Sequence, residues 1–220
     1  MILPRPHEAV ILDMDGTLLD TESIYIRTFL ETSASLGYAL PETFLHGFVG
    51  LPNAEFQARL RAHLGEEFPY AEHRQMYLAR RTELLDQGIP IKPGALELIA
   101  HLEATGTPMA IATAATRANA HENLTRAGLL QRFAVVLTRD DVEHSKPRPD
   151  LFLRAAAALG IDPAGCVAVE DSHNGVRAAH AAGMMTVMVP DILTASDEIR
   201  AMCVAVVESL HDVRRIIGGS

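Results

Sequence analysis

The sequence predicts an α/β fold in which a parallel sheet carries helices on both faces and a small helical module is inserted. Short apolar runs rich in Val, Ile and Ala recur along the chain, and each is followed by a turn and a helical pattern. This alternation is typical of parallel sheets whose strands are buried on both faces. One interval of about 65 residues after the first run shows only helical periodicity, which predicts the inserted module.

Five apolar runs are the predicted strands. Each is only a few residues long and is bounded by turn-forming residues or charges, as expected for strands in the middle of a covered sheet. Because parallel strands need helical crossovers between them, the helical patterns that follow the runs support the same interpretation. By residue number the predicted strands are 9–12, 109–112, 134–137, 166–169 and 185–189.

Three of the predicted crossover helices carry recognisable end signals. Apolar positions recur at helical spacing over 95–102, and Gly106 ends that segment. Thr116 is placed to cap a second helix, which ends at Gly128. Pro149 begins a third helix in its first turn, where a missing backbone N–H costs nothing.

The inserted module is assigned to residues 21–87. Residues 1–20 and 88–220 then form the sheet-containing core. The segment 87–94 contains Gly, Pro and Lys in a pattern typical of turns, and it marks the return of the chain to the core.

Composition excludes several classes of protein. The 220 residues carry a formal net charge of -9, from 19 basic and 28 acidic side chains. Nucleic-acid binders and proteins of anionic membrane surfaces gather excess Lys and Arg, so we expect neither kind of partner. Hydrophobic residues make up 48% of the chain, which excludes a disordered or low-complexity protein. A small molecule is the expected partner.

Cellular context is predicted from the apolar runs and the cysteines. No apolar run approaches the length of a membrane span, and the first residues do not resemble a secretion signal. Cys166 and Cys203 lie far apart and outside any metal-binding spacing, so we expect reduced, buried thiols. We therefore expect a cytoplasmic protein, with a monomer as the default state.

Two aspartates follow the first predicted strand directly. The segment reads Asp13-Met-Asp15-Gly-Thr17, which places both carboxylates at the carboxyl end of a buried strand, where open α/β sheets bind ligands. Taken alone, the pattern also suits an acidic turn or part of a calcium loop. The EF-hand interpretation fails because the later ligand positions and the closing glutamate are missing.

Polar residues follow three further predicted strands. Thr113 and Ala114 come after the second, Lys146 after the third, and the pair Glu170 and Asp171 after the fourth. Taken singly, Thr113 is explained as a helix cap and Lys146 as a solvated cation. Glu170 and Asp171 are explained as an acidic pair at the start of a helix. Since parallel strands end at one edge of a sheet, we expect all of them to converge on a single site.

This set of residue types suits phosphoryl transfer. Asp13 is a candidate nucleophile, because a carboxylate can attack phosphorus. Two unit charges about 4 Å apart repel by about 4 kcal/mol near a protein surface, so a cation must bridge the two anions. Asp13, the Asp15 carbonyl, Asp171 and Glu170 offer the oxygen ligands that Mg²⁺ prefers.

Three of these residues receive further roles. Asp15 lies close enough in sequence to act as general acid and base. The Lys146 charge and the Thr113 hydroxyl, with the backbone at Ala114, are candidates to hold the phosphoryl oxygens.

These motifs resemble the four motifs of the haloacid dehalogenase superfamily of phosphotransferases. They are DMDGT at 13–17, Thr113, KPRPD at 146–150 and VEDSHNG at 169–175. The resemblance covers nearly the whole chain, and the helical insert matches the cap position of the phosphoglycolate phosphatase and β-phosphoglucomutase-like branch. It implies a Rossmann-like core and a mobile cap that closes over the substrate and excludes water.

The sequence departs from the mutases of this branch in the cap. Tyr25 stands where their early cap helix carries a His, and 51–53 stands where their cap loop carries an Arg. Alanines also replace the two serines that follow the second-motif threonine in many relatives. Fewer cationic groups for a distal phosphate favour a phosphatase over a mutase. The candidate replacement cations are Arg59, Arg61, Arg80 and Arg81.

The sequence therefore predicts a Mg²⁺-dependent phosphatase that hydrolyses a small phosphorylated metabolite, such as a sugar phosphate, through a phosphorylated Asp13. A β-phosphoglucomutase-type enzyme is the alternative, and a non-catalytic binding protein on the same scaffold is a third. Glu22 and Asn53 in the cap are the candidates for substrate specificity. His173 is interpreted as an ordinary solvated residue.

Overall fold

The chain divides into two compact units, each described here by itself. The computed structural model describes residues 3–41, 43–46, 48 and 53–219. The core unit comprises residues 1–20 and 90–220, and the helical unit comprises residues 21–89.

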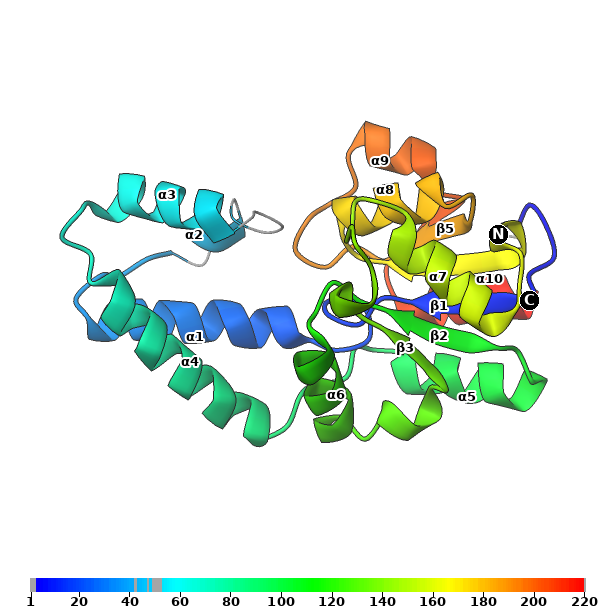
Figure 1. Ribbon diagram of the computed structural model, residues 1–220, viewed down its shortest axis with the longest axis horizontal. Helices are drawn as coiled ribbons and strands as arrows, with labels where there is room; N and C mark the ends of the chain where they lie inside the picture. The colour runs from blue at the N-terminus through cyan, green and yellow to red at the C-terminus, as the bar shows by residue number, and fades with distance from the viewer. Residues whose placement is uncertain (1–2, 42, 47, 49–52, 220) are drawn as a thin grey trace. The chain divides into compact units, whose positions relative to one another are not determined.

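The core unit is built on a six-stranded sheet in which every pair of neighbouring strands is parallel (Figure 1). The strand order is β3-β2-β1-β4-β5-β6, so β1 and β4 lie at the centre and the strand order reverses between them. The predicted α/β class with a parallel sheet is confirmed. The strands are β1 (Ala9–Leu12), β2 (Met109–Ala112), β3 (Val135–Leu137), β4 (Cys166–Glu170), β5 (Met185–Met188) and β6 (Ala205–Val206).

Helices cover both faces of this sheet. On one face α7 and α8 pack on the strands, with Phe152 of α7 fully buried against Ile11 and the alanines of the central strands. On the other face α5 and α10 pack against each other (Figure 1). The α-helices of the core unit are α5 (Ala95–Thr105), α6 (Arg117–Arg126), α7 (Asp150–Leu159), α8 (His173–Ala181), α9 (Asp197–Met202) and α10 (Leu210–Gly218), and short 3-10 turns span Leu130–Arg132, Arg139–Asp141 and Pro163–Gly165.

The predicted helix ends agree closely with the observed ones. Gly106 ends α5 in the left-handed conformation, with φ of 67°. The Thr116 hydroxyl accepts a hydrogen bond from the Asn119 N–H and caps α6. That helix ends at Arg126, two residues before the predicted Gly128, and α7 begins directly after Pro149.

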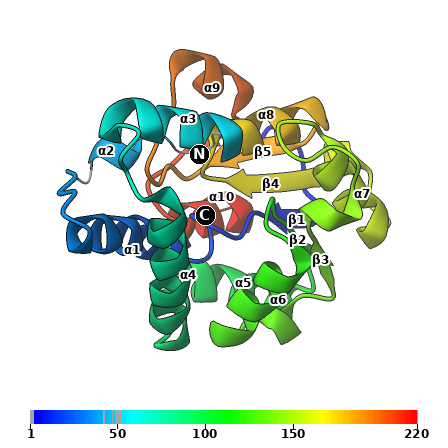
Figure 2. The ribbon, with the colours of Figure 1, turned by 60° about the vertical axis from the view of Figure 1, so that its left-hand side comes forward.

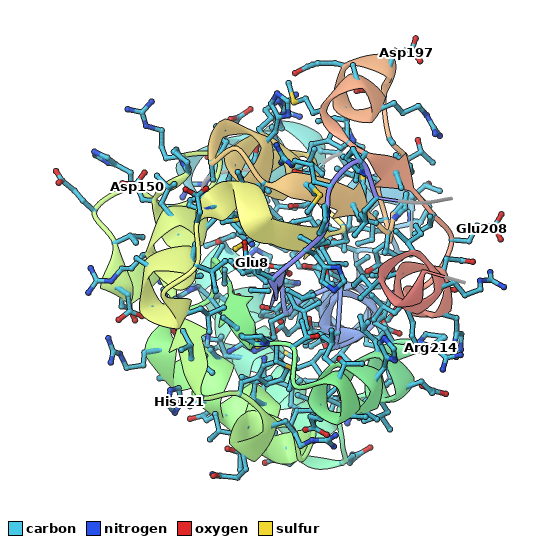
Figure 3. The ribbon with its side chains drawn as sticks, turned by 90° about the vertical axis from the view of Figure 1, so that its right-hand side faces the viewer. Glu8, His121, Asp150, Asp197, Glu208 and Arg214 are labelled. Carbon is cyan, nitrogen blue, oxygen red and sulfur yellow. The ribbon has the colours of Figure 1, made fainter. Side chains whose placement is uncertain are left out.

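The sixth strand was not predicted. Ala205–Val206 pairs with β5 at the edge of the sheet, and two residues are too few to create a recognisable pattern. The outer surface of the core unit is charged, as Figure 3 shows for Asp197, Glu208 and Arg214. Arg214 and Arg215 are exposed on α10, as expected for a solvated helix face.

The helical unit has its own small apolar core. Helices α1 and α4 lie side by side (Figure 2). Buried Phe29, Leu45, Leu60 and Phe68 form the centre of this core, and further aromatic side chains pack around them. The helices of this unit are α1 (Thr21–Ser35), α2 (Thr43–His46), α3 (Asn53–Leu64) and α4 (Tyr70–Asp86).

None of the helices in the described ranges has the length and apolar character needed to cross a bilayer. Cys166 and Cys203 are both free thiols, the first buried and the second half-buried. Burial raises the pKa of each thiol to about 11, so neither is a ready thiolate nucleophile.

Candidate active site at the carboxyl edge of the sheet

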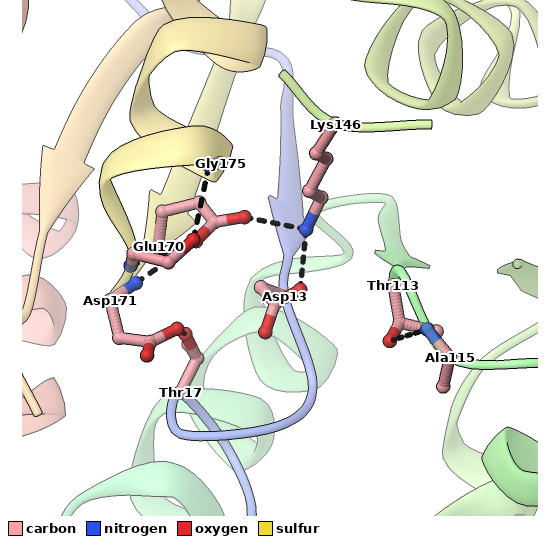
Figure 4. A network of polar contacts seen from close by, with 9 residues as sticks. Asp13, Thr17, Thr113, Ala115, Lys146, Glu170, Asp171 and Gly175 are labelled. Atoms are coloured by element: carbon pink, nitrogen blue, oxygen red, sulfur yellow. Dashed lines mark hydrogen bonds and ion pairs between the residues drawn. The ribbon is translucent and has the colours of Figure 1, made fainter. Parts of the chain in front are cut away.

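The carboxyl ends of the central strands bring the predicted residues together (Figure 4). Asp13 follows β1, and its N–H donates to the Val169 carbonyl of β4 at 3.0 Å. Thr113 follows β2, and its N–H donates to the Leu137 carbonyl of β3 at 2.9 Å. The hydrogen bonds of the sheet therefore continue one residue past β1 and β2. They hold the backbone of Asp13 and Thr113 at the edge of the sheet.

Lys146 lies between two buried carboxylates. Its Nζ donates to Asp13 Oδ1 and, at 2.5 Å, to Glu170 Oε1. The three side chains are 4%, 8% and 0% exposed respectively, so water screens these charges very little. The Phe152 ring lies 5.1 Å from Nζ, which adds a cation–π contact from α7.

Glu170 is held by the start of the next helix. Its Oε2 accepts hydrogen bonds from the N–H groups of Asp171 and Ser172 and from the Ser172 hydroxyl, at 3.0–3.2 Å. With Lys146 on the other oxygen, both carboxylate oxygens have partners. Glu170 is therefore suited to fixing the position of Lys146 and of the backbone after β4.

Two glycines leave room for these carboxylates. A Cβ on Gly175 would lie 1.8 Å from the Glu170 carboxylate. Gly16 has φ of 83°, and a Cβ there would lie 2.4 Å from Asp171 Oδ2. Both positions therefore require a residue without a side chain.

Thr17 fixes the second acid of the fourth motif. Its hydroxyl donates to Asp171 Oδ1 at 3.0 Å, which joins the loop after β1 to the loop after β4. The DMDGT motif thus contributes a carboxylate at Asp13, a close approach at Gly16 and an orienting hydroxyl at Thr17.

The carboxylates outnumber the cations in this buried site. Burial raises the pKa of Asp13, Glu170 and Asp15 raise it further, and Lys146 offsets part of the effect. Burial followed by the Glu170 and Asp13 charges raises the pKa of Asp171 in the same way. Burial alone would lower the pKa of Lys146, but the two carboxylates outweigh it and raise that pKa. The site thus favours an additional positive charge.

A divalent cation fits these residues. Asp13, Glu170 and Asp171 each offer a carboxylate oxygen, and the three oxygens lie within 4.8 Å of one another. Carboxylate oxygens are the ligands of hard cations such as Mg²⁺. Because Glu170 already accepts bonds on both oxygens, Asp13 and Asp171 are the better donors. A bound cation would neutralise phosphate charge as the nucleophile approaches.

The remaining predicted residues lie in different places. Asp15 is half-buried beside Asp13, and Ala114 is exposed next to Thr113. The Thr113 hydroxyl accepts a hydrogen bond from the Ala115 N–H at 3.0 Å. Glu22 lies on α1 of the helical unit. The Asn53 side chain and most of the loop at 47–52 fall outside the described residues.

The arginines that are candidates to replace the missing cap cations also lie in different environments. Arg80 pairs with Glu31 and Glu83 on the surface of the helical unit, and Arg59 pairs with Glu55. Arg61 is exposed on α3. Arg81 instead lines a pocket in the helical unit, together with Glu22.

Sequence reasoning missed an ion pair at the same edge of the sheet. Lys92 Nζ lies 2.6 Å from Asp191 Oδ1, and both side chains are largely buried. A Cβ on Gly16 would lie 3.2 Å from Asp191 Oδ2. That oxygen is buried and has no hydrogen-bond partner in the described structure. A signal was available, because Asp191 lies three residues after the end of β5, close to the edge where the other acids lie.

His173 is accounted for structurally. It is the first residue of α8, and its Nε2 lies 2.9 Å from the Thr194 carbonyl. This contact ties the helix start to the loop after β5.

The fold and the site together define a class of enzyme, the α/β phosphohydrolases with an acidic site at the carboxyl ends of the central strands. The chain belongs to the haloacid dehalogenase-like hydrolases, whose family model matches residues 10–189. The family predicted from the four motifs is confirmed.

Known proteins similar to this chain support the same family. Hexitol phosphatase B of Escherichia coli (strain K12) is 32% identical over 206 residues, which cover 86% of each chain. A HAD family hydrolase of Deinococcus radiodurans R1, solved with bound phosphate and sodium, has a TM-score of 0.86 and 27% identity, covering 97% of this chain and 96% of that one. A mutant form of CbbY from Rhodobacter sphaeroides, solved with xylulose-(1,5)bisphosphate, has a TM-score of 0.73 and 29% identity, covering 93% of this chain and 95% of that one.

Proposed function

We propose that the protein is a Mg²⁺-dependent phosphatase that hydrolyses a sugar phosphate or a similar small phosphate monoester through a phosphorylated Asp13. One observation carries the proposal. Asp13, at the end of β1, is buried against Lys146 and lies within metal-ligating distance of Asp171. This arrangement supports Asp13 as the nucleophile, with Lys146 as a fixed positive charge and a cation bound beside them.

In the first step, one Asp13 carboxylate oxygen attacks phosphorus and the ester P–O bond breaks. Asp15 gives its proton to the departing alkoxide, so the alcohol leaves neutral. Lys146 and Thr113 donate to the phosphoryl oxygens and keep the group in line. In the second step, Asp15 takes a proton from water, the water oxygen attacks phosphorus, and the bond to Asp13 breaks.

The relatives support the phosphate-ester substrate. One is a hexitol phosphatase and one binds a sugar bisphosphate. Another was solved with bound phosphate and sodium. We further propose that the protein acts in the cytoplasm as a monomer.

A screen for phosphate release tests this function. The purified protein is incubated with a panel of phosphorylated sugars, polyols and carboxylates, with Mg²⁺ or with EDTA. We expect release from at least one monoester, lost with EDTA and restored by added Mg²⁺. No release from any ester, or release that EDTA does not affect, would contradict the proposal.

A trapped intermediate tests the covalent step. We expect Asp15→Asn to retain attack by Asp13 on a good leaving group but to hydrolyse the product slowly, because water then lacks its general base. Intact-mass measurement after exposure to p-nitrophenyl phosphate should show one added phosphoryl group. Asp13→Asn/Asp15→Asn should show none.

A further inference from the structure

Asp191 has one carboxylate oxygen that no described residue contacts through a hydrogen bond. Asp191 lies in the loop after β5, and Lys92 Nζ donates to its Oδ1 at 2.6 Å. The other oxygen, Oδ2, is buried and has no hydrogen-bond partner in the described part of the chain. A buried acceptor without a donor is unfavourable, so such oxygens nearly always have a partner. We therefore expect Oδ2 to accept a hydrogen bond from a bound molecule.

The unpaired oxygen lies beside the loop that follows β1. A Cβ placed on Gly16 would lie 3.2 Å from Asp191 Oδ2 and 2.4 Å from Asp171 Oδ2. The distance between the two carboxylate oxygens therefore cannot exceed the sum of these two distances. The Asp171 side chain is itself held by Thr17, which donates to its other oxygen (Figure 4). Asp191 is thus a near neighbour of a proposed cation ligand.

The spacing favours a contact through water over direct ligation. Among the described residues, the carboxylates that each offer an oxygen within 4.8 Å of the others are Asp13, Glu170 and Asp171, and Asp191 is not one of them. Two hydrogen bonds of about 2.8 Å each, through one water molecule, span the largest distance that the Gly16 geometry allows. Mg²⁺ dehydrates reluctantly and usually keeps several waters when carboxylates bind it.

The surrounding contacts fix Asp191 in this position. The Lys92 N–H donates to the Leu18 carbonyl at 2.9 Å, which attaches Lys92 to the segment just after the DMDGT motif. The Val189 N–H donates to the Glu170 carbonyl at 2.7 Å, which attaches the start of the loop after β5 to the end of β4. The Lys92 and Asp191 side chains are 20% and 16% exposed, so water weakens their ion pair little. All these residues belong to the core unit.

We propose that Asp191 is a positioning residue of the cation site, whose Oδ2 accepts a hydrogen bond from a water molecule bound to the divalent cation. The proposal rests on the Mg²⁺ site of the proposed function, and it adds a carboxylate from outside the four sequence motifs. An ion pair that only joined two loops would account for Oδ1, which Lys92 contacts, but would leave Oδ2 without a partner. Residues that hold the ligands of a metal typically change its affinity by about 10–100-fold.

Calorimetric titration with magnesium chloride tests the proposal without substrate and without catalysis. The whole chain is treated with EDTA, dialysed and titrated. We expect Asp191→Asn to raise the Kd for Mg²⁺ about tenfold or more, because a neutral amide is a weaker acceptor than a carboxylate. Asp197→Asn removes an exposed carboxylate of the same unit and should leave the Kd unchanged, so it controls for net charge. Equal Kd values for the parent and Asp191→Asn would overturn the proposal.

Unfolding in EDTA and in Mg²⁺ separates cation binding from a purely structural role. The ion pair with Lys92 contributes to stability in both conditions, whereas the proposed water contact contributes only with Mg²⁺. At Mg²⁺ concentrations well above both Kd values, a tenfold difference in Kd makes the stability gained from Mg²⁺ about 1.4 kcal/mol smaller in Asp191→Asn than in the parent. Equal gains from Mg²⁺ in the two proteins would overturn the proposal.

A crystal structure of the parent protein grown with Mg²⁺ requires no variant. We expect a water molecule that is bound to the ion and lies within hydrogen-bond distance of Asp191 Oδ2. Direct ligation by Asp191, or a bound ion with no such water, would overturn the proposal.

The dependence of turnover on Mg²⁺ distinguishes a positioning residue from a catalytic one. We expect Asp191→Asn to need about tenfold more Mg²⁺ for half-maximal activity, with kcat at saturating Mg²⁺ within about threefold of the parent. A lower kcat with an unchanged requirement for Mg²⁺ would overturn the proposal.

The outcomes separate this proposal from the function on which it rests. A parent protein that binds no Mg²⁺ in the titration or in the crystal would refute the cation site itself, and with it the Mg²⁺-dependent phosphatase. Binding by the parent with the same Kd in Asp191→Asn would refute only the role of Asp191 and leave the phosphatase intact.

Discussion

The core unit and the helical unit handle charge in opposite ways. In the core unit, Asp13, Lys146 and Glu170 are buried together, and backbone N–H groups at the start of α8 fix the Glu170 carboxylate. In the helical unit, the pocket wall is aromatic, and its charges are one carboxylate and one stacked guanidinium near the linkers, with Arg74 exposed. The difference teaches that the core unit concentrates charge in one buried network, whereas the helical unit surrounds its pocket mainly with uncharged rings.

The largest effect should follow from loss of the nucleophile. Asp13→Asn keeps the shape of the side chain but removes its charge and its nucleophilic oxygen, so we expect kcat/KM to fall by about 10³-fold or more. Asp197→Asn, an exposed acid of the core unit, is the matched control and should retain full activity. Activity of Asp13→Asn within about tenfold of the parent would refute the nucleophile assignment.

A substitution beside Glu170 should lower the stability of the protein as well as its activity. In Gly175→Ala the new methyl group would overlap the Glu170 carboxylate, and that side chain cannot move without breaking its bonds to Lys146 and Ser172. We expect a loss of about 3 kcal/mol or more in the free energy of unfolding, together with loss of activity.

Chemical denaturation of the protein measures this loss of unfolding free energy. Arg177→Ala lies on the same helix and removes only a surface ion pair with Glu198, so it serves as the control. Equal stability of Gly175→Ala and Arg177→Ala would mean that Glu170 is not held as tightly as its contacts indicate.

The two units should also differ in how they respond to the loss of an ion pair. Lys92→Met leaves Asp191 largely buried with no cation on either oxygen, so we expect a loss of about 1–3 kcal/mol in unfolding free energy. Arg80→Met breaks exposed pairs of the helical unit and should cost less.

A double-mutant cycle sharpens this comparison. Lys92→Met combined with Asp191→Leu removes both charges, and we expect it to recover part of the loss of the single variant. Additive losses in the cycle would show that the pair contributes no coupling energy.

The contrast between the units also explains what the sequence could predict. Asp13, Thr113 and Glu170 were assigned correctly to one edge because strand ends are readable from apolar runs, and parallel pairing then brings them together. The pocket could not be foreseen in this way. Glu22 and Arg81 line one pocket because α1 packs on α4, and helix packing depends on side-chain shapes that periodicity does not encode.

The smallest expected effect is the change in stability of the helical unit with pH. His73 is buried, its Nε2 lies 3.0 Å from the Ser33 hydroxyl, and burial lowers its pKa below the ordinary value of 6.5. As the pH falls below about 6.5, the unfolded chain binds a proton at this residue before the folded one does, so stability decreases. We expect a loss of less than about 1 kcal/mol between about pH 7 and pH 5.5.

All four tyrosines lie in the helical unit, so tyrosine emission during denaturation reports on this unit and not on the core. His73→Gln keeps a hydrogen-bonding group toward Ser33 but cannot titrate, and its stability should vary less with pH than that of the parent. His121→Gln alters an exposed histidine of the core unit (Figure 3) and should follow the parent. Equal pH dependence in His73→Gln and the parent would show that the aromatic wall tolerates a charged ring, which would weaken the contrast between a charged core and an uncharged pocket wall.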